Sequence, residues 1–216
     1  MLRFKEYIKE CRRLQKKYSR EIRIFVGMEI ETCTGYEKFV PWLINKVQPD
    51  YIVGSVHFVE DVGFDYSKNE YIKAIEKTGN PDALYCRYFD LQFEMISLLK
   101  PAVVGHFDLI RLFDDNYRKR LSKPAIQKRI RRNLQLIKKL GLILDLNLRS
   151  LAKGACEPYP STAILDAACR LKIPVIPGDD SHSIRSVGNF METGIQILAE
   201  KRLPAQWQKP EVLHFS

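Results

Sequence analysis

The chain has 216 residues, of which 45% are hydrophobic and 28% charged, and its formal net charge is +9 at pH 7. This length and composition predict a single globular domain over residues 1–216, with a core at about 21–200 and a surface tail at 204–216 docked by Trp207. No apolar run reaches the roughly 20 residues of a membrane span, and the charged N-terminal stretch has no apolar signal-peptide core, so the sequence argues against a membrane protein and predicts a cytoplasmic location.

Helix-like and strand-like segments alternate along the chain. Apolar spacing and capping residues predict helices at 2–18, 37–47, 82–99, about 118–140 and 161–171. Runs of β-forming residues predict strands at 22–31, 51–57, 102–106, 142–147 and 174–178, with an irregular stretch between the second strand and the 82–99 helix. Strands separated by helices imply parallel pairing, and therefore an α/β barrel or an open α/β sheet.

Three local features support these assignments. Asp82 and Ser161 are expected to cap the N-termini of their helices, and Gly141 is expected to end the basic helix before it. Four apolar residues of the 82–99 helix recur at helical spacing and are expected in the core: Tyr85, Phe89, Phe93 and Ile96.

Most of the positive charge lies in two expected helices, at 5–20 and 118–139. In the second, apolar residues from Ile126 to Leu140 occupy one face, and lysines and arginines occupy the other. This pattern is typical of a solvated outer helix and lacks the interleaved aromatic residues of a nucleic-acid surface. The patch can still attract an anionic substrate over long range.

The five cysteines are odd in number and show no CxxC spacing. They therefore predict neither a disulfide framework nor a zinc knuckle, and we expect reduced and mainly buried thiols.

Three of the four histidines follow short β-type runs, in IVGSVHF, VVGHFD and VIPGDDSH. The carboxyl ends of parallel strands converge on one rim, and imidazoles and carboxylates gathered there are ligands for Zn²⁺, Mn²⁺ or Fe. The strand ends supply these candidates: Glu29 or Glu31, His57, His106, Asn147, and Asp180 with His182. Four basic residues near the same motifs are candidates for binding a phosphate group: Arg111, Arg149, Lys153 and Arg185.

Six segments, in order, resemble the histidinol phosphatases of the polymerase-and-histidinol-phosphatase (PHP) superfamily. They are GMEIE at 27–31, GSVHF at 54–58, VVGHFDLIR at 103–111, LDLN at 144–147, EPYPS at 157–161 and GDDSH at 178–182. The resemblance implies a distorted PHP-type (β/α)7 barrel with two or three divalent metal ions. It also implies hydrolysis of L-histidinol phosphate to L-histidinol and phosphate in histidine biosynthesis.

Carried over to this chain, the family pattern makes Glu29 a bridging carboxylate that shares one ion with His57 and His106. Asp180 belongs to a second ion and His182 to a third. Glu31 lies two residues beyond Glu29 and points to the same side of a strand, so it is a secondary candidate.

The chain departs from the family pattern because nothing before Glu21 contains a histidine, whereas family members begin with a His-x-His strand. The expected barrel is therefore incomplete at its N-terminal side, and 1–216 is expected to be a fragment of a longer enzyme, with a second chain that completes the barrel as the alternative. We expect low phosphatase activity from 1–216 alone, with rescue by an upstream His-x-His segment. The family often has arginine at the position of Ala152. Arg149 or Lys153 is therefore expected to make the phosphate contacts there.

Two alternatives remain open at this point. The first is a degenerate barrel that acts as a non-catalytic, RNA-binding subunit of ribonuclease P type, for which the net charge and missing ligands would be suitable. The second is a PHP phosphoesterase with another substrate. Salt-sensitive RNA binding without bound metal would favour the first, and a comparison of phosphate esters would identify the second.

Overall fold

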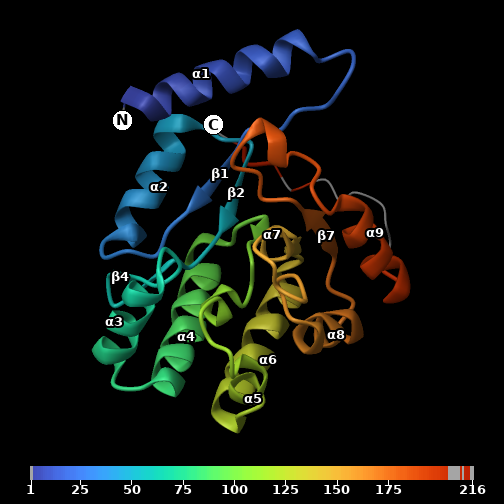
Figure 1. Ribbon diagram of the computed structural model, residues 1–216. Coiled ribbons are helices and arrows are strands. Elements are labelled where there is room, and N and C mark those ends of the chain that lie inside the picture. The colour runs from blue at the N-terminus through green and yellow to red at the C-terminus, as the bar shows by residue number, and fades with distance from the viewer. Residues whose placement is uncertain (1, 204–209, 211, 215–216) are drawn as a thin grey trace.

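A sheet of parallel strands forms the centre of the molecule in the computed structural model, which describes residues 2–203, 210 and 212–214 (Figure 1). Trp207 lies outside these residues. The strand order is β1 (Gly27–Ile30), β2 (Tyr51–Gly54), β5 (Val103–Val104), β6 (Ile143–Asn147) and β7 (Val175–Gly178). Each neighbouring pair is parallel, with Met28 opposite Ile52 and Asn147 opposite Gly178 at the two edges. The predicted α/β fold is confirmed, and within the described residues β1 and β7 are the unpaired edges of an open sheet.

Helices connect the strands and pack on the sheet. They are α1 (Leu2–Lys17), α2 (Tyr36–Val47), α3 (Lys68–Thr78), α4 (Pro81–Leu99), α5 (Tyr117–Leu121), α6 (Pro124–Leu140), α7 (Arg149–Ala152), α8 (Thr162–Arg170) and α9 (Met191–Glu200). In Figure 1, α1 lies at the top, apart from the helices of the lower half. Arg12 of this helix donates to the Asp50 carboxylate at 2.6 Å and to the Gln48 carbonyl at 2.6 Å, and Phe4 packs against the core.

The core is centred on α4 and α6, which pack against each other. Leu134 and Ile137 of α6 are fully buried, as are Tyr85, Phe89 and Ile96 of α4. Asn133 joins the two helices by donating to the Phe89 carbonyl and to the Gln92 side chain, so its buried amide is satisfied. The predicted apolar stripe of α4 is thus confirmed at three positions.

Phe93, the fourth residue of that stripe, is only partly buried. The Arg132 guanidinium lies 4.2 Å from the centre of its ring. This contact covers the ring with a cation rather than with the apolar core.

The helix ends differ in detail from the predictions. Asn80, and not Asp82, caps α4, because its side-chain oxygen accepts from the Ala83 N–H at 2.9 Å and Pro81 occupies the first turn. Asp82 instead pairs with Arg120 and Lys123. Gly141 ends α6 as predicted, with φ +68°, a conformation that glycine adopts at little cost.

Ser161 stands at the N-cap position of α8, but its hydroxyl makes no capping bond. The Glu157 carboxylate accepts the Thr162 N–H at 2.8 Å in its place. A negatively charged group at a helix N-terminus satisfies the free N–H and interacts favourably with the helix dipole.

The stretch predicted to be irregular contains a short antiparallel hairpin, β3 (Phe58–Val59) and β4 (Val62–Gly63), followed by α3. Ser67 caps α3 by accepting the Glu70 N–H. The spacing of Ser67 and Glu70 was a readable capping signal. This hairpin and helix extend from the carboxyl end of β2 and form a wall beside the strand ends.

All five cysteines are unpaired, as predicted, but none is buried: Cys33 and Cys156 are exposed, and the other three are partly buried. The expectation of mainly buried thiols is therefore wrong. Among the described residues, no helix combines the length and the apolar character needed to cross a bilayer.

Candidate metal centre

Three of the predicted ligands meet at the carboxyl edge of the sheet. Glu29 comes from β1, His57 follows β2 and His106 follows β5. The two imidazole Nε2 atoms are 3.1 Å apart, and the Glu29 Oε1 atom lies 3.1 Å from His106 Nε2 and 3.7 Å from His57 Nε2. One nitrogen or oxygen from each side chain therefore points to a common centre, the arrangement of a group able to hold a metal ion.

Neighbouring groups fix the orientation of these ligands. The His57 Nδ1 atom lies 2.9 Å from a Glu31 carboxylate oxygen, which leaves Nε2 facing the centre. Ser55 donates its hydroxyl to Glu29 Oε1 at 2.6 Å. Glu31 was predicted as a secondary ligand candidate, and the structure places it behind His57, outside the three-ligand group.

Gly105 allows the close approach of β2 to the His106 backbone. A Cβ atom at this position would lie 2.6 Å from the Ser55 hydroxyl oxygen, which is inside contact distance. The absence of a side chain here therefore preserves the Ser55 hydroxyl that holds Glu29.

Neighbouring groups lower the pKa of Glu29 and raise that of His57. Burial acts to raise the pKa of Glu29, but the His106 hydrogen bond and charge, with Ser55 and His57, hold it at about 2. Burial acts to lower the pKa of His57, and the hydrogen bond and charge of Glu31 outweigh it, so that this pKa is raised. Glu29 is consequently an anion across the physiological range and a suitable oxygen ligand.

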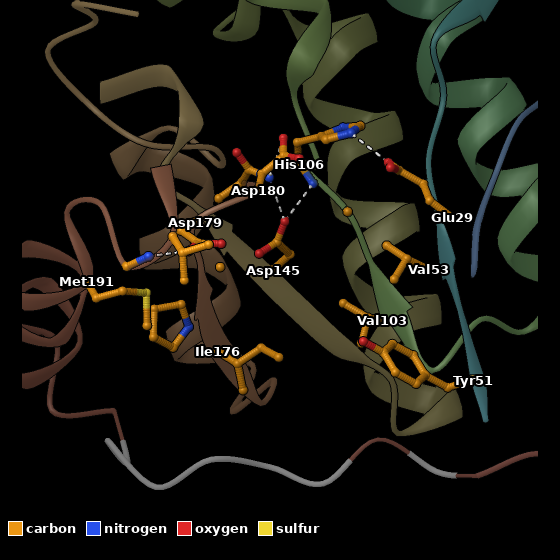
Figure 2. Close-up of a pocket in the computed structure, with 16 residues that line it drawn as sticks. Glu29, Tyr51, Val53, Val103, His106, Asp145, Ile176, Asp179, Asp180 and Met191 are labelled. Carbon is orange, nitrogen blue, oxygen red and sulfur yellow. Dashed lines mark hydrogen bonds and ion pairs between the residues drawn. The ribbon is translucent and has the colours of Figure 1, made fainter. Parts of the chain in front are cut away.

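A first cavity of about 480 Å³ adjoins this group and is lined by residues from all five strands of the sheet (Figure 2). Figure 2 shows Glu29 and His106 facing one another, Asp145 and Asp180 beside His106, and Tyr51, Val53, Val103 and Ile176 along the apolar part of the wall. Asp180 is linked to Asn147, whose amide donates to its carboxylate at 3.3 Å. The predicted residues Asn147 and Asp180 therefore lie in the same cavity as Glu29 and His106.

Asp180 has φ +49°, in the left-handed region that few residues other than glycine adopt. Such conformations cost free energy and persist where surrounding contacts impose them, often at functional sites.

Asp145 belongs to this cavity and was not among the predicted site residues. Its carboxylate accepts from the Asn147 amide at 2.9 Å and from the His106 backbone N–H at 3.4 Å. Burial raises the pKa of Asp145 to about 7. The signal was present in the sequence, because Asp145 and Asn147 are two residues apart on β6 and so point to the same face.

A second cavity, of about 710 Å³, lies on the other side of Glu29 and is walled by the β3–β4 hairpin and the start of α3. It contains His57 and the last predicted ligand, His182, whose Nδ1 atom lies 2.8 Å from the Asp180 carbonyl oxygen. His182 is exposed and does not join the three-ligand group. Glu29 lines both cavities, whereas Asp180 lines the first and His182 the second.

The predicted phosphate contact Arg111 is engaged in the fold. Its side chain is buried, and the guanidinium donates to the carbonyls of Glu157 and Pro158 at 3.0 and 2.7 Å. The rings of Tyr117 and Tyr159 lie 4.9 and 4.3 Å from its central carbon. Arg111 lines neither the first nor the second cavity.

Glu157 is the buried acid of the same cluster. Tyr117, Arg118 and Thr162 all donate to its carboxylate. Burial acts to raise its pKa, but these hydrogen bonds hold it down at about 2. The EPYPS segment thus ties the start of α5 to the start of α8.

The other three predicted phosphate contacts lie near the strand ends without lining either cavity. Arg149 opens α7 after β6, and Lys153 follows that helix. Arg185 lies in the exposed turn Ile184–Ser186 after β7.

Residues 1–149 match the PHP domain. The chain belongs to the PHP family. Among relatives, the protein of Schizosaccharomyces pombe named "Probable histidinol-phosphatase" is 34% identical over 189 residues, which cover 86% of this PHP chain and 62% of that protein. The histidinol-phosphatase of Saccharomyces cerevisiae is 27% identical and is covered over 64% of its length. The chain thus spans somewhat less than two thirds of these curated relatives.

Solved structures give the same fold. HisK of Listeria monocytogenes superposes with a TM-score of 0.79 at 29% identity, over 87% of this PHP chain and 74% of that one. The histidinol phosphate phosphatase of Lactococcus lactis, solved with zinc, L-histidinol and phosphate, gives a TM-score of 0.69 at 16% identity, over 92% and 74% of the two chains. The fold is therefore the α/β fold of the PHP histidinol phosphatases, as the sequence resemblance implied.

Proposed function

We propose that this protein hydrolyses L-histidinol phosphate to L-histidinol and phosphate, a step of histidine biosynthesis, with the help of divalent metal ions. The observation that carries the proposal is the convergence of Glu29, His57 and His106 at the rim of a PHP fold. The names of the relatives, and the zinc, L-histidinol and phosphate in the Lactococcus lactis structure, support the choice of metal chemistry and of substrate.

The donor geometry fits a zinc-sized ion. Two ligands about 2.0–2.1 Å from a tetrahedral ion are about 3.3–3.4 Å apart. The three donor atoms here are separated by 3.1, 3.1 and 3.7 Å, which matches one face of such a tetrahedron within a few tenths of an ångström.

The sequence-based assignment of ligands is retained as part of this proposal. Glu29, His57 and His106 hold one ion, Glu29 and Asp180 contribute to a second, and His182 contributes to a third, each being Zn, Mn or Fe. When bound, such ions lower the pKa of water and stabilise charge on phosphoryl oxygens. Metal content measured on the purified protein gives their number and identity.

The side chains of the protein prepare this site for the phosphate ester. Glu31 holds His57 in the tautomer whose Nε2 lone pair faces the centre, and Ser55 fixes one oxygen of Glu29. We propose Arg149, Lys153 and Arg185 as residues that attract or bind the phosphate group, because their charges lie at the same edge of the sheet.

Phosphate release from the metal-loaded chain tests the proposal. We expect metal-dependent release from L-histidinol phosphate that exceeds release from p-nitrophenyl phosphate, and loss of it in His106→Ala. Glu37→Gln, on the exposed start of α2, is the matched control and should behave as the wild type. A chain that binds zinc stoichiometrically and releases no phosphate from L-histidinol phosphate, with or without an added His-x-His segment, would contradict the proposal.

The remaining parts of the proposal concern partners and location. A second polypeptide that completes the sheet is proposed because β1 and β7 are unpaired edges within the described residues. Size-exclusion chromatography with light scattering tests this proposal.

A cytoplasmic location is proposed because all five cysteines are unpaired. Salt-sensitive RNA binding by a chain without bound metal would instead favour the ribonuclease P alternative.

A further inference from the structure

The second cavity contains an acidic side chain, Asp65, that has no hydrogen-bond or ion-pair partner among the described residues. This cavity adjoins the three-ligand group and shares Glu29 and His57 with it. Its outer wall carries Asp65, two residues beyond β4, together with the aromatic ring of Phe58. A molecule bound at the metal group therefore has room to extend toward Asp65.

The other acidic residues of the outer wall already have partners. These pairs are Glu31 with His57, Asp61 with the backbone and hydroxyl of Thr34, and Glu70 with Lys73. Asp65 forms no hydrogen bond and no ion pair with any described residue, although it is partly buried. A carboxylate that has lost part of its hydration without gaining a partner is costly, and a bound cation removes that cost.

We propose that Asp65 binds the protonated amino group of the substrate and so selects a phosphate ester of an amino alcohol over neutral or anionic esters. The proposal rests on the function proposed above, in which the metal group takes the phosphate end. The ammonium group then forms a charge-assisted hydrogen bond with Asp65. The Phe58 ring provides an apolar surface for the rest of the alcohol.

Calorimetric titration of the zinc-loaded chain with L-histidinol, in the presence of phosphate, tests the assignment. Loss of a hydrogen bond to a charged group predicts about 10- to 100-fold weaker binding of L-histidinol by Asp65→Asn. Glu70→Gln is the matched control, because it removes the same charge from the same cavity wall at a carboxylate already paired with Lys73. It should bind L-histidinol within about twofold of the wild type, which is the range expected for an exposed ion pair.

A second ligand separates the ammonium contact from a general effect on the cavity. 3-(Imidazol-4-yl)propanol lacks the amino group, so wild type and Asp65→Asn should bind it with equal affinity. Zinc content, phosphate affinity and melting temperature should be the same in all three proteins.

Each contrary result has its own meaning. Equal binding of L-histidinol by Asp65→Asn and wild type, or equal losses for the two alcohols, would overturn the role of Asp65. Reduced zinc content in Asp65→Asn would identify a metal ligand instead and would also overturn it. A wild-type chain that binds zinc and phosphate but not L-histidinol would refute this inference alone, whereas one that binds neither zinc nor phosphate would refute the proposed function as well.

Discussion

Glu31 provides the most specific test of how the metal group is assembled. Within the three-ligand group it contacts His57, whose Nδ1 atom lies 2.9 Å from the Glu31 Oε2 atom. In Glu31→Gln the side-chain oxygen can still accept a hydrogen bond, but it carries no charge. We therefore expect the tautomer of His57 to be held less firmly and its Nε2 to be a weaker donor.

The size of the effect follows from the exposure of the two partners. A hydrogen bond to a charged group contributes about 1.5–3 kcal/mol when it is protected from water. The Glu31 side chain is 47% exposed and that of His57 is 16% exposed, so solvent screening reduces this contribution to about 1 kcal/mol. Zinc affinity should therefore fall about fivefold in Glu31→Gln, and by about tenfold or more in Glu31→Ala, where no acceptor remains.

Competition for zinc with a chromogenic chelator measures this change directly. The matched control is Glu37→Gln, which removes the same charge from an exposed position on α2 and should leave zinc affinity unchanged. His106→Ala sets the upper limit, because it removes a ligand whose side chain is only 6% exposed. Zinc affinity equal to that of the wild type in both Glu31 variants would refute the orientation argument.

Three further predictions concern stability and the geometry around the site. Leu134→Ala, at a fully buried position of α6, should lower the free energy of unfolding by about 3 kcal/mol in urea titrations, whereas Leu98→Ala, at a half-exposed position, should lower it by less than about 1 kcal/mol; equal losses would contradict the assigned core. Gly105→Ala should weaken zinc binding by displacing the Ser55 hydroxyl from Glu29, and unchanged affinity would show that this hydroxyl is dispensable. Glu157 has a folded-state pKa of about 2 against an ordinary value of 4.5, so its stabilisation is present above about pH 4.5 and is lost as the pH falls toward 2. Up to about 3 kcal/mol is involved, and Glu157→Gln should flatten the fall of the melting temperature over that window, an effect that fails to appear if the carboxylate is not paired.

The sequence predicted the order of helices and strands well because the apolar residues repeat with the periods of those elements. The basic helix is an example, since Ile126, Ile130 and Leu134 define its buried face and Gly141 ends it. The irregular stretch was the main failure. Its hairpin strands are two residues long and so carry no period-2 signal, and only Ser67 and Glu70 indicated the start of α3.

The candidate ligands were also readable in the sequence, because parallel strands bring their carboxyl ends to one edge. His57 and His106 each follow a strand, and Glu29 lies at the end of another, so their approach required only the correct fold class. Their family role came from the resemblance of the six motifs. The sequence could not show which basic residues face the site, and Arg111 illustrates why: only packing revealed that two carbonyl groups and two aromatic rings occupy its guanidinium.

The sequence by itself therefore determined the fold class and the residue types of the site, since both depend on local periodicity and on motifs a few residues long. The tertiary structure decided the contacts between distant segments. It placed Glu31 behind His57 as an orienting group, brought the Asp145 carboxylate against the His106 backbone, and left Asp65 without a protein partner in the second cavity. Hydrogen bonds and ion pairs between residues far apart in the chain require distances of about 3 Å between their side chains. Such distances are fixed only when the strands and helices pack.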